Sequence, residues 1–204
     1  MADANKPEKP EGAEEIEKQG LEGMVRALQN STDPQVRQYA AYLLGQTKNP
    51  RAIQPLIEAL ADFDKSVREQ ATLALSSIGK AAIEQLTAAM KEKKWETRYR
   101  AAEALGKIAD ERVVQPLIKA LQDNRDHVRY MAAKGLRELG DSDAIEPMII
   151  LIKDENRYVR MMAATVLGTI GGKKVNTALR NALESEEDEK VKEAINEAIN
   201  EAMK

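Results

Sequence analysis

Apolar residues recur along this chain with the spacing of amphipathic helices, and the predicted helices come in pairs. In the second helix of each pair, Val or Thr precedes a basic residue, and Ala or Ile follows it three places later. The basic residues are Arg37, Arg68, Arg98, Arg129, Arg160 and Lys192. The steps between them are 31, 30, 31, 31 and 32 residues, and a period of this length predicts a helical solenoid.

The first helix of each pair carries its own apolar stripe, as in the segment 52–60. Pro55, Pro116 and Pro147 share one position near the start of this helix, where a missing N–H breaks no intrahelical bond. We therefore expect an all-α fold, a right-handed superhelix of about six two-helix repeats with a period of about 31 residues. The predicted repeats cover residues 14–46, 50–78, 80–108, 110–139, 141–170 and 172–203.

Capping residues and glycines delimit the second helices. Side-chain oxygens that can accept from free N–H groups stand before four of them, at Asp33, Asp64, Asn156 and Asp188. The predicted helix ends are marked by Gly79, Gly140 and Gly171. Glycine also lies inside three second helices, at Gly45, Gly106 and Gly168, which predicts a close approach of another helix there.

Composition bounds the class of protein. Residues 1–13 are almost entirely polar and predict a disordered tail, followed by one repeat domain over residues 14–204. The net charge is −3 with both signs mixed along the chain, which disfavours nucleic acid and anionic membranes as partners. The chain has no Cys and no apolar run near ~20 residues, so we expect a cytoplasmic protein without disulfides or a membrane span.

The repeated elements resemble a known family. Pro-Leu-Ile-x-Ala-Leu, an Asp-bearing turn and Val-Arg-x-x-Ala-Ala-x-x-Leu-Gly are similar to HEAT repeats of the phycobilisome-lyase-like type. The resemblance implies that first helices line a convex side and second helices a concave, ligand-facing side. It also implies a ladder between neighbouring repeats, formed by Arg37, Arg68, Arg98, Arg129 and Arg160 with Asp62, Asp123 and Asp154.

Enzymes of this fold give three comparisons. Deoxyhypusine hydroxylases hold a di-iron centre with several His-Glu pairs, whereas this chain has only His127, which excludes that activity. We predict no metal, cofactor or catalytic residue. Alkylpurine DNA glycosylases present a basic, aromatic groove, which this charge balance disfavours. Bilin lyases have no short catalytic signature, so a bilin-lyase-like or other cofactor-assembly factor stays open as the alternative function.

With second helices facing inward, the places one, two, five and nine after the basic residue should be exposed. Four of the five tyrosines and three methionines fall on these places. Such side chains are favoured at interfaces, which predicts a non-catalytic scaffold for a protein partner with apolar anchors and acidic residues. The predicted partner-binding residues are Tyr39, Tyr42, Tyr99, Arg100, Tyr130, Met131, Lys134, Met161 and Met162.

The sequence leaves several alternatives open. The tyrosines and methionines could instead fill grooves between adjacent second helices. Trp95 and Tyr158 either rim the predicted groove or pack between turns. The negative charge of the acidic run 184–189 either stabilises the N-terminus of the last helix or binds a cation weakly. Open repeat ends can stack, so we expect a monomer or weak self-association.

Overall fold

The computed structural model describes residues 6–203, and over this range it contains thirteen α-helices, four short 3-10 helices and no strand. The chain divides into two compact units, which meet in the sequence between Ile108 and Ala109 and are described separately. The 3-10 helices are Pro50–Ala52, Gly79–Ala82, Glu111–Val113 and Ser142–Ala144. Each leads into the first helix of a repeat, as expected for a fold built from helix pairs.

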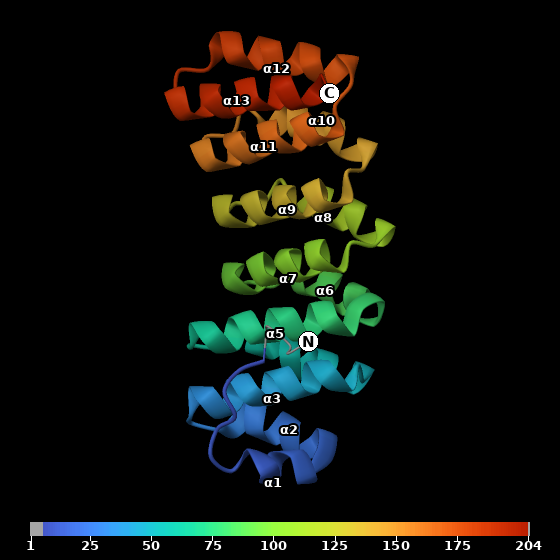
Figure 1. Cartoon of the computed structure of the whole chain (residues 1–204), viewed down its shortest axis with the longest axis vertical. Coiled ribbons are helices and arrows are strands. Elements are labelled where there is room, and N and C mark those ends of the chain that lie inside the picture. Colours follow the sequence, from blue (N-terminus) through green and yellow to red (C-terminus); the bar gives the residue numbers. More distant parts are fainter. Residues whose placement is uncertain (1–5, 204) are drawn as a thin grey trace. The chain divides into compact units, whose positions relative to one another are not determined.

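Unit 1 consists of two layers of helices. Its helices are α1 (Ala13–Lys18), α2 (Gly20–Asn30), α3 (Pro34–Thr47), α4 (Ile53–Ala59), α5 (Lys65–Ile78), α6 (Ile83–Ala89) and α7 (Trp95–Ile108). The second helices α3, α5 and α7 lie side by side in one layer (Figure 1), and α2, α4 and α6 form the other. Each first helix packs against the second helix of its own repeat.

Unit 2 has the same arrangement. Its helices are α8 (Val114–Ala120), α9 (Asp126–Leu139), α10 (Ile145–Leu151), α11 (Arg157–Ile170), α12 (Lys173–Ser185) and α13 (Glu189–Ala202). The second helices α9, α11 and α13 are neighbours, with α11 in the middle (Figure 1). The predicted all-α repeat fold is thus confirmed.

Local sequence signals set where the second helices begin and end. The side chains of Asp33, Asp64, Asn156 and Asp188 all accept backbone N–H groups at the predicted helix starts. The second helices α5, α9 and α11 end at Gly79, Gly140 and Gly171, each with a positive φ. These signals act within a few residues of the chain, which is why they can be recognised in the sequence alone.

Two glycines allow second helices to approach closely, as predicted. A Cβ built on Gly45 would lie 2.8 Å from the Cα of Ala74 on the neighbouring α5. In unit 2, a Cβ on Gly168 would lie 2.8 Å from the Cα of Ala198 on α13. Any larger side chain would push the two helices apart.

The opening of the first repeat departs from a continuous helix. Gly20 has a φ of 63°, and the helix is broken there into α1 and α2. The disordered tail predicted for residues 1–13 lies partly outside the described residues, because residues 1–5 are not described. Residues 6–12 form no helix, and the buried Ala13 begins α1, one residue before the predicted repeat.

The core lies between the two layers of each unit. The Leu seven places after the repeat Arg is fully buried in every case, at Leu44, Leu75, Leu105, Leu136 and Leu167. Within residues 6–203, no helix is both long enough and apolar enough to cross a bilayer.

Candidate binding surface

The second-helix face, meaning the surface of α3, α5 and α7 in unit 1 and of α9, α11 and α13 in unit 2, holds the predicted partner-binding residues. Two places after the repeat Arg, three predicted residues are buried rather than exposed: Tyr39, Met131 and Met162 are 2%, 5% and 8% accessible. The predicted exposure of these three side chains is therefore wrong. At the same place, Arg100 on α7 reaches Glu69 on the preceding α5, which shows that this position points into the seam between second helices.

Tyr39 is covered by the first helix of the chain. Its hydroxyl donates a hydrogen bond of 2.6 Å to Glu17 Oε1 on α1, and its ring centre lies 6.2 Å from that of Tyr42. Burial, together with the bond to the Glu17 carboxylate, raises the pKa of Tyr39 to about 12. Tyr39 is thus a packing residue at the start of unit 1.

Tyr42, Tyr99 and Arg100 remain accessible in part on the second-helix face of unit 1. The ring of Tyr99 meets Trp95 edge-on at 6.4 Å, so Trp95 packs beside the face. The guanidinium of Arg100 lies 5.3 Å from the centre of the Tyr99 ring. It is also bonded to Glu103 at 2.8 Å and lies 3.8 Å from Glu69. Because these carboxylates already balance the charge of Arg100, this side chain does not require an acidic group from a partner.

Three predicted residues remain accessible in unit 2. Lys134 is exposed, and Tyr130 and Met161 are half-buried. Tyr158 is exposed at the start of α11, where it holds the guanidinium of Arg157 4.9 Å from its ring centre. Each unit therefore offers a few aromatic or flexible apolar side chains rather than a continuous apolar stripe.

The ladder arginines bridge neighbouring repeats within each unit. Arg37 binds both oxygens of Asp62 through Nε and Nη2, each at 2.8 Å. In unit 2, Arg129 binds Asp154 at 2.7 and 2.9 Å, and Arg160 binds Glu186 at 2.8 and 3.1 Å. In all three arginines, Nη1 donates to backbone carbonyls of the turn before its own helix.

The ladder pairs shift the pKa values of their members. Burial alone would raise the pKa of Asp62, but the bonds from Arg37 and from the backbone N–H of Asp64 outweigh it and hold the pKa below its ordinary value. The same balance, with Arg160 as the cation, lowers the pKa of Glu186. The bond to Asp62 raises the pKa of Arg37, so the pair is ionised at neutral pH.

The ladder differs from the expected set at two places. Glu186 was not among the predicted ladder residues, although it stands six residues before Lys192, as Asp62 stands six residues before Arg68. Arg68 has no carboxylate within 4 Å among the described residues, unlike the arginines above. Arg98 and Asp123 fall in different units, so their pairing stays a prediction.

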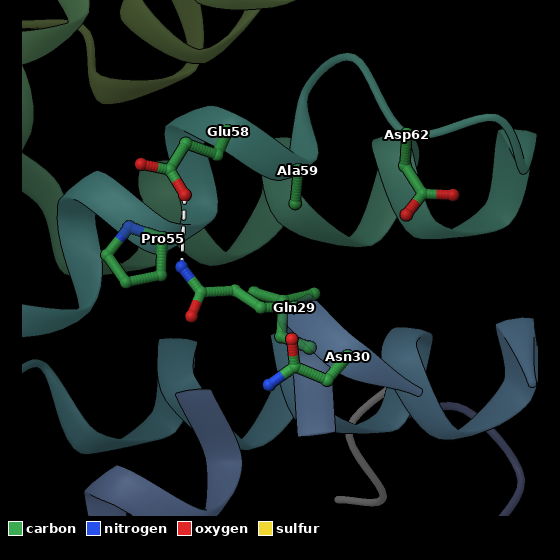
Figure 2. Close-up of a pocket in the computed structure, with 7 residues that line it drawn as sticks. Gln29, Asn30, Pro55, Glu58, Ala59 and Asp62 are labelled. Atoms are coloured by element: carbon green, nitrogen blue, oxygen red, sulfur yellow. Dashed lines mark hydrogen bonds between the residues drawn. The ribbon is translucent and has the colours of Figure 1, made fainter. Parts of the chain in front are cut away.

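Hollows lie beside the ladder. In unit 1, a hollow of about 330 Å³ lies between the ends of α2 and α4 and reaches Asp62 (Figure 2). Gln29 points across it and donates to Glu58 at 3.0 Å. A second hollow, of about 460 Å³, is lined by Arg160, Glu186 and neighbouring residues of unit 2. Both are polar and shallow.

The described part of the chain contains no group of three or more His, Cys, Asp or Glu side chains arranged to hold a metal ion. His127 lies beside Asp126, with 2.7 Å between its Nδ1 and the Asp126 Oδ1.

Sequence and structure comparisons agree with this description. The profile of HEAT repeats matches residues 21–94, 79–129 and 114–200, and the chain belongs to the HEAT-repeat family. A search of curated protein sequences gives no match.

Solved structures extend the likeness. A chain from the complex of CpcE and CpcF of phycocyanin lyase from Nostoc sp. PCC7120 is 25% identical, with 74% of this chain and 99% of that chain covered and a TM-score of 0.68. A designed armadillo repeat protein in complex with the peptide (KR)4 is 22% identical over 90% and 99% of the two chains, with a TM-score of 0.56. Human deoxyhypusine hydroxylase is 21% identical over 92% and 75%, with a TM-score of 0.54. The last two show the fold alone.

Proposed function

We propose that this protein is a non-catalytic scaffold that binds a protein partner on its second-helix face. The observation that carries the proposal is the partial exposure of Tyr42 on α3 and Tyr99 on α7, in the first and third repeats of unit 1, with the half-buried Leu73 on α5 between them. Tyrosine combines a rigid apolar ring with a hydrogen-bonding tip, a combination enriched in binding surfaces. In unit 2, Tyr130, Met161 and Lys134 supply similar contacts.

The partner should bring apolar side chains to Tyr42 and Leu73. A carboxylate of the partner would be matched by Lys134 rather than by Arg100, because Glu103 and Glu69 already balance the charge of Arg100. Tyr39, Met131 and Met162 are left out of the proposed contact set because they are buried. The cytoplasmic location also stays a prediction.

The test compares two tyrosine variants that remove similar side chains. A partner captured by the native protein should be lost, or bind about tenfold more weakly, with the Tyr42→Ser, Tyr99→Ser variant. Tyr158→Ser removes a tyrosine that is 56% exposed outside the predicted contact set and serves as the control. Circular dichroism and thermal unfolding verify that both variants fold. Equal binding by the native protein and the double variant would reject the second-helix face as the site.

A second candidate is a lyase-like cofactor-assembly factor. It is favoured by the likeness to a chain of the CpcE and CpcF complex, which covers 99% of that chain at 25% identity. In this case an open-chain tetrapyrrole would occupy the second-helix face. Titration with such a pigment, followed by visible absorbance and circular dichroism, separates the two functions. Saturable binding that Tyr42→Ser and Tyr99→Ser abolish would favour the assembly factor over the protein-binding scaffold.

A further inference from the structure

A fully exposed phenylalanine stands on the turn between α4 and α5. Phe63, the only Phe of the chain, is 103% accessible. It lies five residues before the repeat Arg, and the other repeats have polar residues there: Thr32, Lys93, Asn124, Glu155 and Glu187. The turn itself therefore does not require an aromatic ring at this position. An exposed large apolar side chain at a polar repeat position is typical of an anchor for a partner.

The ladder rung beside Phe63, meaning the ion pair that Arg68 would form with a carboxylate of the next turn, is incomplete. Arg68 uses Nη1 for the carbonyls of Asp62 and Phe63, at 2.7 and 2.9 Å, as the other ladder arginines do for their own turns. The opposite edge of its guanidinium, formed by Nε and Nη2, binds no side chain of the described residues. No buried side-chain nitrogen or oxygen of residues 6–203 lacks a partner, so this edge is open to solvent.

The following turn explains why the rung is open. Arg37 reaches forward to the turn of the next repeat, and by the same geometry Arg68 faces the turn 91–94. This turn reads Lys-Glu-Lys-Lys, and all four side chains are exposed. Glu92 holds the place equivalent to Asp62, six residues before the repeat Arg, but forms no ion pair with Arg68. Three lysines of this turn and the open guanidinium edge thus bring positive charge to two consecutive turns, the first of which carries the exposed Phe63 ring.

We propose that this basic-aromatic turn patch, formed by Phe63, Arg68, Lys93 and Lys94, binds an acidic segment of a partner protein. A carboxylate of that segment completes the rung by a two-point bond to Nε and Nη2 of Arg68, as Asp62 does for Arg37. An apolar side chain next to that carboxylate packs on Phe63, and Lys93 and Lys94 interact with further acidic groups.

The surroundings favour such a segment over a polyanion. Asp64 and Glu69 flank Arg68, and Glu92 and Glu96 flank the lysines, so the patch is positive only over a short distance. A nucleic acid would bring its phosphates against these carboxylates. A short segment with a few carboxylates limits this repulsion, and its apolar side chain packs on the Phe63 ring. The patch is distinct from the tyrosines of the second-helix face and does not depend on their role.

The test uses a defined probe. A short fluorescein-labelled peptide with Glu on both sides of a Leu, flanked by Gly and Ser, is titrated with the full chain and followed by anisotropy. The control peptide has Gln in place of Glu. We expect binding of the Glu peptide that weakens as salt is raised, and binding of the Gln peptide at least about tenfold weaker. Equal binding of the two peptides, or no saturable binding of the Glu peptide, would overturn the proposal.

Variants of the chain then locate the probe. Arg68→Gln should weaken the Glu peptide about tenfold and Phe63→Ser about fivefold. The matched controls are Ile150→Ser, which removes another exposed apolar side chain, 76% accessible, and Tyr42→Ser on the second-helix face. Neither control should change the affinity of the peptide. Loss of binding with Tyr42→Ser but not with Phe63→Ser would contradict the turn patch and point to the second-helix face instead.

Two further measurements separate ligand binding from folding. Arg68→Gln also removes the bonds from Nη1 to its turn, so Lys93→Glu, which leaves Arg68 in place, should weaken the peptide as well. Glu92→Asp introduces the shorter acid that is found at Asp62, and we expect this acid to bind Arg68. The new ion pair should raise the thermal midpoint of the chain and lower its affinity for the peptide. Unchanged affinity in Lys93→Glu would overturn the proposal. The proposal would also be overturned if inorganic phosphate displaced the peptide and Phe63→Ser left the peptide affinity unchanged. Those two results together describe an anion site without an apolar anchor.

Discussion

The ladder arginines hold neighbouring repeats together through a two-sided contact. One edge of the guanidinium binds a carboxylate of the next turn, while Nη1 binds carbonyls of the preceding turn. The planar shape of the group suits both contacts at once, which a lysine cannot reproduce. The side chains of Arg37 and Asp62 are only 13% and 12% accessible, so water compensates little when one partner is removed.

We therefore expect Arg37→Gln to lower the free energy of unfolding by about 2 to 4 kcal/mol, because it leaves the Asp62 carboxylate buried without its cation. Urea denaturation measures this change. The double variant Arg37→Gln, Asp62→Asn should recover part of the loss, since it leaves no charge behind. Additive losses in the double variant would show that the two residues do not interact.

Acid should weaken the ladder. The pKa values of Asp62 and Glu186 are lower in the folded chain than the ordinary values of about 3.9 and 4.3 expected when unfolded. Their contribution to stability is therefore complete above about pH 4.5 and is lost as the pH falls through the folded values. Urea midpoints measured from pH 6 to about pH 2 should fall less steeply in Arg37→Gln than in the native protein. Parallel profiles would contradict this account of Asp62.

Tyr39 has the opposite dependence on pH. Its pKa is raised to about 12 in the folded chain, against about 10 when unfolded. The resulting stabilisation is complete below about pH 10 and is lost as the pH rises through the folded value. Absorbance of tyrosinate should show one tyrosine that titrates late, and Tyr39→Phe should remove that step at a cost of about 1 kcal/mol at neutral pH. A late step that persists in Tyr39→Phe would assign it to another tyrosine.

At the level of elements, helix spacing depends on residues without side chains. Gly45→Ala places a methyl group 2.8 Å from the Cα of Ala74, so α3 and α5 must separate. We expect a loss of about 1 to 3 kcal/mol in the free energy of unfolding, even though Ala favours the helix more than Gly does. Adding Ala74→Gly should restore part of the stability by making room. Greater stability in Gly45→Ala alone would show that the helices separate without cost.

The sequence predicted the elements better than the surface. The caps at Asp33 and Asp188 and the turn at Gly140 depend on neighbours in the chain, so local reasoning identified them. The burial of Met131 and Met162 depends on how adjacent second helices pack, which periodicity alone does not fix. The cover over Tyr39 arises because α1 lies against α3 and places Glu17 within reach, a tertiary contact without a local signal.

At the level of the whole molecule, the repeat architecture has consequences for stability. In a repeat protein each helix pair is stabilised mainly by its neighbours, so the stability is close to a sum of local contributions. The contacts that hold α3 to α5 and α11 to α13 belong to different compact units. A defect in one unit should therefore loosen that unit more than the other.

Hydrogen exchange can measure how far such a defect spreads. Gly45→Ala should accelerate amide exchange in α2 to α5, whereas Gly168→Ala, with its close contact to Ala198, should act on α11 to α13. The two variants introduce the same methyl group against the same type of backbone contact, so each serves as the control for the other. Acceleration of every helix by either variant would mean that the chain unfolds as one cooperative body. In that case a partner bound to unit 1 would stabilise unit 2 as well, whereas local unfolding confines the effect of the partner to the repeats it contacts.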